Sequence, residues 1–241
     1  MYAVILAGGL GTRLRPYTHS IPKPLLPLGE RPVLEILLHR LKDCGVSSAC
    51  LSLGYLAPII KAFVGTGERW GMDISCIIEE QPLGTAAPLR LVPDLPADFF
   101  VVNGDTLTDL DFAKLHRTHR DSNAWATVFT PEIEEVTDYG IIEIAPGDDS
   151  VARYIEKPKR RFHVSSGIYA LSRRIIDYIP ASGRFDMPDL VQRAIAEGRP
   201  VRAFRADAYW RDIGRLDHFE MANRDFVATP ERFLGSAGQA K

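Results

Sequence analysis

A glycine-rich segment near the start of the chain has the composition of a phosphate-binding loop. It follows an apolar run that predicts a buried strand over residues 2–6, and it reads Ala7-Gly8-Gly9-Leu10-Gly11-Thr12-Arg13. Three glycines let backbone N–H groups approach an anion, because no Cβ stands in the way. Arg13 and Lys23 add fixed positive charge to the same stretch, which suits a triphosphate. The segment predicts a phosphate cradle, with a glycine-rich surface turn and a solvated lysine between prolines as the alternatives.

This loop differs from the two common glycine-rich nucleotide-binding motifs. A dinucleotide-binding fingerprint needs G-x-G-x-x-G running into the N-terminus of a helix. Here Pro16, Pro22, Pro24 and Pro27 follow the glycines, and prolines at this density exclude a long helix. No Gly-Lys-Ser/Thr follows at the spacing of a P-loop. The sequence favours a long, stiff, cationic loop that wraps a nucleotide, and it disfavours a dinucleotide-dependent oxidoreductase.

Two aspartates stand in settings that suit a magnesium ion. Asp105 ends the segment Asn103-Gly104-Asp105 after an apolar run, and Asp212 lies within Trp210-Arg211-Asp212-Ile213-Gly214. Magnesium is bound by few protein carboxylates together with phosphate oxygens. The alternatives are a turn-forming role for Asp105 and an ion pair with a neighbouring arginine for Asp212.

Strand and helix signals alternate through the first half of the chain. Apolar runs bounded by turn residues predict strands over residues 2–6, 49–53, 74–78, 99–102 and 126–129. Amphipathic segments predict helices over residues 32–44, 59–64 and 111–120. This alternation implies a mostly parallel sheet covered by helices on both faces. Because ligands gather outside the carboxyl ends of such strands, we expect the glycine loop and Asp105 at one edge.

The second half is less regular, but the same signals continue. Strands are expected over residues 139–144, 151–156, 164–171 and 209–212, and helices over residues 173–179, 187–197 and 216–226. We find no linker and no internal repeat. The sequence therefore predicts one domain over residues 1–227, followed by a flexible tail over residues 228–241.

Bulk composition is that of an ordinary globular protein. The chain has 241 residues, of which 46% are hydrophobic and 25% charged, and its net charge is −2. This balance gives no general attraction to nucleic acid or to an anionic membrane. Cys44, Cys50 and Cys76 lack metal-binding spacing and are expected to be structural thiols in a reducing compartment. His116 and His119 are expected to lie on a solvated helix face, with metal ligation as the alternative. We expect a cytoplasmic protein.

Five motifs, in order along the chain, resemble the signature of the sugar-1-phosphate nucleotidyltransferases, also called NDP-sugar pyrophosphorylases. The first reads A-G-G-x-G-T-R-L-x-P, followed by P-K-P-L-L-P; the others are Glu79–Ala86, Asn103–Asp105, Ile155–Pro158 and Trp210–Gly214. Together they span residues 1 to about 225. The resemblance implies a Rossmann-like α/β fold with one mostly parallel mixed sheet flanked by helices. It implies no left-handed β-helix domain, since the chain resembles the catalytic half of its longer relatives.

The resemblance also implies a reaction and its residues. An oxygen of a sugar-1-phosphate would attack the α-phosphorus of an NTP in line, and pyrophosphate would leave, with Mg2+ as cofactor. Arg13, Lys23 and Asp105 would be catalytic, and Asp105 and Asp212 would bind the metal. The implied nucleotide-binding residues are Leu6, Ala7, Gly8, Gly9, Gly11, Thr12, Gln81, Gly84 and Thr85. The implied sugar-phosphate-binding residues are Asn103, Gly104, Tyr139, Gly140, Glu156, Lys157, Ser165 and Ser166.

Three short segments bear on the substrates. Leu83–Leu89 is similar to the L-G-T-A-G-P-L of guanylyltransferases, and Phe185–Leu190 is similar to a segment of short bacterial guanylyltransferases. GTP is therefore favoured, with uridylyl or thymidylyl transfer as the alternative. Ser165-Ser166-Gly167 replaces the family's Asn-Ala-Gly, which favours a sugar other than mannose because serine has a shorter reach and no amide. A non-catalytic nucleotide-sugar-binding regulatory subunit is the rival on the same fold, and a homodimer is compatible with either.

Overall fold

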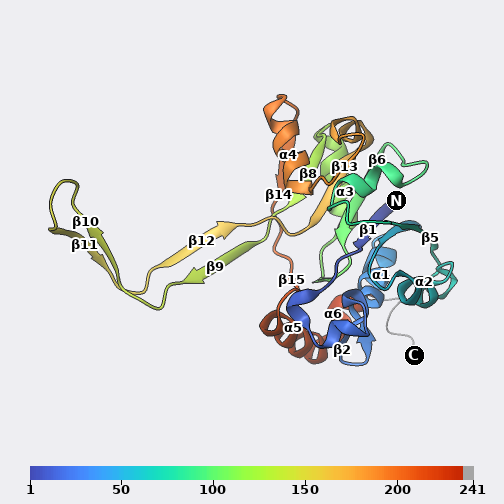
Figure 1. Ribbon diagram of the computed structural model, residues 1–241, viewed down its shortest axis with the longest axis horizontal. Coiled ribbons are helices and arrows are strands. Elements are labelled where there is room, and N and C mark those ends of the chain that lie inside the picture. Colours follow the sequence, from blue (N-terminus) through green and yellow to red (C-terminus); the bar gives the residue numbers. More distant parts are fainter. Residues whose placement is uncertain (236–241) are drawn as a thin grey trace.

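A seven-stranded mixed sheet forms the centre of the molecule (Figure 1), whose computed structural model describes residues 1–235. The strands follow one another in the order β14-β8-β13-β6-β1-β4-β5. In chain order they are β1 (Tyr2–Ala7), β4 (Ser48–Leu53), β5 (Asp73–Ile78), β6 (Asp98–Asn103), β8 (Ala126–Phe129), β13 (Ile168–Ser172) and β14 (Val201–Phe204). Strand β13 runs antiparallel to β6 and β8, and the remaining neighbours are parallel. The expected mostly parallel mixed sheet is confirmed.

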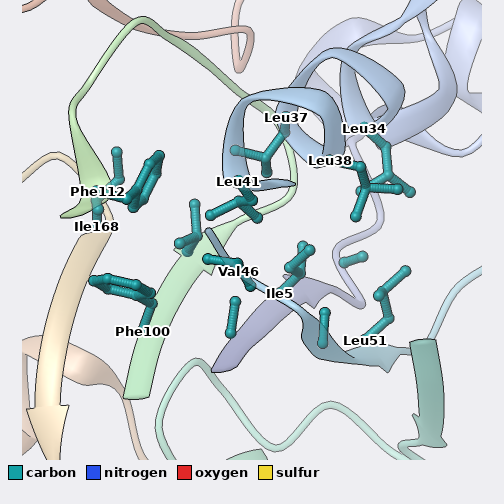
Figure 2. Close-up of a cluster of buried hydrophobic side chains, with 14 of the residues drawn as sticks. Ile5, Leu34, Leu37, Leu38, Leu41, Val46, Leu51, Phe100, Phe112 and Ile168 are labelled. Atoms are coloured by element: carbon teal, nitrogen blue, oxygen red, sulfur yellow. The ribbon is translucent and has the colours of Figure 1, made fainter. Parts of the chain in front are cut away.

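Helices cover both faces of this sheet. One face packs against α1 (Val33–Asp43), α2 (Ala57–Val64) and α3 (Phe112–Asp121). Figure 2 shows the α1 side chains of this cluster, among them Leu34 and Leu41, close to Ile5 of the sheet. The other face packs against α4 (Met187–Ala196) and two 3-10 segments, Ala87–Leu91 and Arg173–Tyr178. The five inner strands are therefore buried on both sides, which explains their largely apolar sequences. The edge strands β5 and β14 keep exposed side chains.

The solvated position expected for His119 is wrong, because this histidine of α3 packs under the sheet next to Thr127. Its burial predicts acid-sensitive stability. His119 is 1% exposed, its Nδ1 lies 2.8 Å from Thr127 Oγ1, and its Nε2 lies 3.5 Å from Asp98 Oδ1. Burial lowers the pKa of His119 from its usual 6.5, although Asp98 acts in the opposite direction. The unfolded chain therefore takes up a proton at a higher pH than the folded chain does.

The contribution of neutral His119 to the free energy of unfolding should be fully present above pH 6.5. It should be lost as the pH falls from there through the lower pKa of His119 in the folded chain. Urea unfolding measured from about pH 7.5 to about pH 5 checks this expectation. A His119→Gln variant should lose stability more gently over the same range. An equal slope in the two proteins would assign the acid sensitivity to other groups.

The C-terminal helices pack against the loop that follows β1. Helix α5 (Leu216–Ala228) and helix α6 (Pro230–Leu234) share a third core cluster with Leu14, Leu26 and Leu28 of that loop. Within α6, Phe233 is fully buried and Leu234 is 5% exposed. The flexible tail expected from residue 228 is therefore wrong for residues 230–234, because two apolar side chains fix them to the core. The rest of that expected tail, residues 236–241, lies outside the described residues.

Short elements shape the edge of the sheet above β1. Three single-turn 3-10 helices, Thr12–Leu14, Tyr17–His19 and Lys23–Leu25, replace a long helix in the proline-rich loop. The two-residue strands β2 (Pro27–Leu28) and β3 (Arg31–Pro32) close this loop. Farther along, β7 (Thr106–Thr108) pairs antiparallel with β15 (Trp210–Asp212). This pairing brings two distant parts of the chain to the same edge.

A long arm, residues 132–163, projects away from the rest of the molecule (Figure 1). Its stem pairs β9 (Glu132–Val136) with β12 (Lys159–His163), and its tip pairs β10 (Ile141–Ile144) with β11 (Val151–Ile155). The tip strands are expected from the sequence, whereas the stem strands are not. Separately, no helix within residues 1–235 is both long enough and apolar enough to cross a membrane.

Candidate active site

A pocket of about 450 Å3 opens at the carboxyl edge of β1 and β6. Its floor is the glycine loop, because β1 delivers the chain directly into it. All of the expected loop residues line the pocket: Leu6, Ala7, Gly8, Gly9, Gly11, Thr12 and Arg13. Lys23, Asn103 and Asp105 line it as well. The structure thus brings the glycine loop and the end of β6 into one cavity.

Lys23 and Asp105 form an ion pair on one wall of this pocket. Both side chains are largely shielded from solvent, at 13% and 19% exposure. The rigid Pro22-Lys23-Pro24 segment holds the lysine, and the end of β6 holds the aspartate. A charge pair removed from water interacts more strongly than one on the surface. Lys23 is therefore part of the pocket, and the alternative of a solvated lysine is not supported.

The β7–β15 pairing places Asp212 beside Asp105. Asp212 lies opposite Thr106 in the register, and the N–H of Ile213 donates to the carbonyl of Asp105 at 3.1 Å. A Cβ at Gly214 would lie 2.9 Å from Arg13 Nη2, 3.3 Å from Lys23 Nζ and 3.4 Å from Asp212 Oδ1. Two cations and a carboxylate therefore surround this glycine. A side chain at this position would displace the end of the Arg13 side chain and crowd Lys23 and Asp212.

Asp212 is held in its ionised form. Burial acts to raise its pKa, but the hydrogen bond from His218, the N–H of Gly214 and the charge of Lys23 act more strongly, so the pKa lies below its usual 3.8. The carboxylate Oδ1 lies 2.9 Å from His218 Nδ1 and accepts the Gly214 N–H at 3.2 Å. No ion pair of Asp212 with Arg211 or Arg215 forms in the described structure; these arginines lie against Asp225 and Asp217.

The donor set at this wall fits a hard divalent cation. Asp212 ends β15, and Asp105 directly precedes β7, the strand that pairs with β15, so both supply carboxylate oxygens from neighbouring positions. No cluster of three or more histidine, cysteine or acidic side chains suited to a metal occurs in the described part of the chain. Magnesium needs no such cluster, because it is bound by one or two carboxylates, waters and substrate phosphates. Zinc, by contrast, would need nitrogen or sulfur ligands.

The opposite end of the pocket is built from the segment that follows β5. Gly84 has φ +89°, and a Cβ there would lie 2.6 Å from the carbonyl of Phe185, so only glycine fits. Thr85 binds Asp186 Oδ1 through its N–H at 2.9 Å and through its hydroxyl at 3.2 Å. This hydroxyl also accepts the N–H of Met187. Thr85 thus anchors the segment to the start of α4.

Sequence reasoning did not single out several residues of this end, although Glu79 and Asp186 belong to two of the quoted segments. Glu79, Arg184 and Asp186 line the pocket. Glu79 accepts hydrogen bonds from Ser52 Oγ at 2.7 Å and from the N–H of Leu83 at 3.1 Å, and it lies next to Gly8. The available signal was its place directly after a strand that ends at the sheet's carboxyl edge. Gln81, which we expected here, is exposed and is not among the pocket residues.

Residues expected to bind the sugar phosphate separate into two groups. Asn103 lines the pocket. Gly167 lies against the Asn103 amide, since a Cβ at Gly167 would clash with it, and this contact places the segment Ser165-Ser166-Gly167 beside Asn103. Ser166 is 2% exposed, and its hydroxyl bonds the Phe129 carbonyl and the Ile168 N–H. Ser165 is exposed, and its hydroxyl lies 2.9 Å from that of Tyr169.

Gly104, the remaining member of the first group, has a different role, and the four residues of the second group lie elsewhere. Gly104 lets β6 approach β1, since a Cβ there would lie 3.1 Å from the Leu6 carbonyl. Tyr139, Gly140, Glu156 and Lys157 all lie on the arm and line no part of the pocket. A single copy of the chain, as described over residues 1–235, does not bring these four residues to Lys23 and Asp105.

A glycine loop at the carboxyl edge of a parallel sheet, with cations and carboxylates facing it, has the architecture of a nucleotide-binding α/β protein. The particular family follows from comparison: the chain belongs to the nucleotidyl transferase family, which it matches over residues 2–229. The resemblance inferred from the five motifs is thereby confirmed.

Individual relatives point to more than one nucleotide. A probable mannose-1-phosphate guanylyltransferase 1 of Oryza sativa subsp. japonica is 35% identical over 98% of this chain and 65% of its own length. A UTP--glucose-1-phosphate uridylyltransferase of Synechocystis sp. is 33% identical over 95% of this chain and 64% of its own length. The chain thus spans slightly less than two thirds of either relative.

One solved structure is matched over nearly its whole length. HddC from Yersinia pseudotuberculosis, complexed with GMP-PN, is 31% identical, with a TM-score of 0.71 over 93% of this chain and 99% of its own.

Proposed function

We propose that this protein transfers a nucleotidyl group from an NTP to a sugar-1-phosphate. A phosphate oxygen of the sugar-1-phosphate attacks the α-phosphorus, the bond from that phosphorus to the bridging oxygen breaks, and pyrophosphate leaves. The observation that carries this proposal is the convergence of Arg13, Lys23, Asp105 and Asp212 at the glycine loop. Since the reaction joins two polyanions, positioning and charge neutralisation are its main requirements.

The chain's own groups divide this work. Gly8, Gly9 and Gly11 line the pocket, and without a Cβ their backbone N–H groups are open to a phosphate. Arg13 offers a planar fork that suits two phosphate oxygens, and Lys23 offers a point charge where negative charge grows on the leaving pyrophosphate. Asp105 holds that lysine in place. No covalent intermediate with the protein is needed.

Asp105 and Asp212 would hold Mg2+, which neutralises phosphate charge when it is bound. This assignment rests on their adjacency across the β7–β15 pair and on oxygen being the ligand atom magnesium prefers.

For the nucleotide we favour GTP, and Glu79 is the reason within the pocket. Guanine carries two neighbouring donors, N1–H and the N2 amino group, whereas uracil and thymine carry a single N–H between carbonyls. A carboxylate has about four acceptor positions, and Ser52 with Leu83 uses two at Glu79. The remaining positions complement guanine. Uridylyl transfer, which one relative's name describes, is the alternative.

A Glu79→Gln variant should lose preference for GTP. We expect its kcat/KM with GTP to fall about 10- to 100-fold, the worth of hydrogen bonds to a charged acceptor, and that with UTP to change much less. Glu80→Gln is the matched control, because Glu80 is exposed and lines no part of the pocket. Equal losses with both nucleotides would mean that Glu79 only supports the loop.

Four NTPs tested against a panel of sugar-1-phosphates, scored by released pyrophosphate, test the function itself. One pair should stand out, and EDTA should abolish its turnover. A protein that binds a nucleotide sugar tightly but turns over no pair would instead be a regulatory subunit on this fold. NAD(P)H binding, which the proline-rich loop disfavours, serves as the negative control.

A further inference from the structure

The arm carries four residues that the motif order assigns to the sugar phosphate, yet it points away from the pocket (Figure 1). Glu156 and Lys157 are exposed, and Tyr139 is 79% exposed. The pocket of the same copy, meanwhile, has Lys23 already paired with Asp105. Lys157 would add a cation for a second substrate phosphate to those that already line the pocket, Arg13, Lys23 and Arg184.

The stem prevents a simple return of the arm to its own pocket. Five residue pairs join β9 to β12, and Glu134 binds Lys159 at 3.0 Å and Arg161 at 3.3 Å across them. The Val164 N–H donates to the Pro131 carbonyl at 3.1 Å, so pairing continues to the edge of the sheet. Folding back would break this ladder. At about 3.3 Å per residue, the segment from the start of β9 to the end of β10 extends about 40 Å.

The tip exposes an apolar face that one copy leaves uncovered. Ile142 lies opposite Tyr154, and Ile144 lies opposite Val151, so the four side chains share one face. Their exposure is between 53% and 63%. A two-stranded ribbon is at best marginally stable alone in water, and an apolar patch of this kind marks an interaction surface.

The stem also exposes apolar side chains. Ile133 and Phe162 are directly opposite each other and are 41% and 43% exposed. The ion pairs of Glu134 belong to the other face, because side chains alternate along a strand. Glu135 and Arg160 share the face of Ile133 and Phe162, whereas Val136 lies on the face of Glu134. The exposed apolar side chains of the stem are therefore mixed with charged ones.

A matching apolar surface lies at the rim of the pocket. Leu10, Tyr17 and Ile21 of the proline-rich loop are between 43% and 56% exposed, and Leu10 also lines the pocket. An arm seated on this rim would bring its motif residues to the glycine loop. The occupant that fits is a second copy of this chain, because only that copy carries the missing residues.

The backbone of Lys157 departs from the extended conformation of a β-strand. Its φ is +40°, a conformation that non-glycine residues rarely adopt and that is retained where it serves function. Its neighbour Glu156 accepts a hydrogen bond from the Tyr154 hydroxyl at 3.1 Å. The tip therefore holds a cation and a carboxylate in fixed positions beside the apolar face.

We propose that two copies of this chain exchange arms, so that each arm supplies Lys157 and Glu156 to the other copy's pocket. Lys157 binds the phosphate of the sugar substrate there, and Glu156 accepts hydrogen bonds from its hydroxyls. Two-fold symmetry makes the exchange reciprocal and completes two identical sites. The assignment of a sugar phosphate to these residues rests on the proposed function, whereas the arm exchange itself does not.

Paired heterodimers test the exchange. A Lys23→Ala chain and a Lys157→Ala chain, carrying different tags, are co-expressed and purified as a heterodimer over both tags. One of its two sites then has an intact body and an intact arm, so we expect about half the wild-type turnover per dimer. The matched control pairs a Lys23→Ala/Lys157→Ala chain with a wild-type chain. Both of its sites then carry one defect, and turnover should drop to that of the single variants.

An arm that serves its own copy gives the opposite pattern. The first heterodimer would then be as weak as the single variants, and the second would keep half the activity. That result would overturn the proposal.

Association and contact are measured without activity. Sedimentation should give a mass of about twice the 26.8 kDa chain, and Ile142→Asp/Ile144→Asp should give a monomer. Ile195→Asp is the matched control, since Ile195 is equally exposed on α4. A wild-type monomer, or a dimer that survives both arm substitutions, would overturn the exchange.

A photo-crosslinking residue at position 139, in mixed 14N- and 15N-labelled protein, should join one copy's arm to the other copy's residues 10–21. Crosslinks from arm to arm, or only within one copy, would contradict the exchange. If wild-type protein turns over no pair of substrates, the proposed function fails, and the mass and the crosslinks still decide whether the arms exchange.

Discussion

Lys23→Ala should lower kcat/KM by about 10^3-fold, with most of the loss in kcat. Removing one positioned donor to developing charge typically costs 10^2- to 10^3-fold, and Lys23 also neutralises Asp105 in a largely shielded pair. The charge matters most when pyrophosphate leaves, so the transition state loses more than the bound NTP does. Steady-state kinetics over NTP concentration separates the two parameters.

Two comparisons separate chemistry from folding in this experiment. Lys114→Ala removes an exposed lysine from α3 and should leave both kinetics and stability unchanged. Lys23→Arg keeps the charge but replaces a point charge by a planar fork, so it should recover only part of the activity. If Lys23→Ala retains more than about a tenth of wild-type turnover, Lys23 does not act on the leaving group.

Much of the central sheet could be predicted because local sequence determines it. Runs such as residues 99–102 and 126–129 are apolar on both faces of their strands, and they are the strands whose side chains the helices cover. The proline-rich loop is equally local, since four prolines exclude a helix whatever surrounds them. Lys23, Asp105 and Asp212 were found for the same reason: each stands in a short motif beside a glycine or a proline.

The missed elements depend on contacts between distant residues. The stem strands read Glu-Ile-Glu-Glu-Val and Lys-Arg-Arg-Phe-His, which alone look like charged loop, and ion pairs across 25 to 27 positions hold them together. Helix α6 is only five residues long and forms because Phe233 finds a place in the third core cluster. Glu79 belongs to the pocket only because β5 and β1 end at the same edge. The outward direction of the arm, finally, has no local signal.

Asp105→Asn should abolish turnover almost completely while leaving the fold intact. The amide keeps the shape of the side chain but removes the negative charge, so both the partner of Lys23 and one proposed magnesium ligand are lost. We expect kcat/KM to fall by at least about 10^3-fold. The Mg2+ concentration that gives half-maximal activity should rise, a shift that a purely structural role would not produce.

Asp212→Asn should shift the magnesium dependence in the same direction but by less. Asp212 is already tied to His218 and to the Gly214 N–H, and an amide oxygen at the same place could still accept one of these bonds. Asp111→Asn is the matched control, because asparagine caps a helix as well as aspartate does. If chelation leaves wild-type turnover unchanged, the two aspartates act only by holding Lys23 and Arg13 in position. Both substitutions would then lower kcat by the same factor at every Mg2+ concentration.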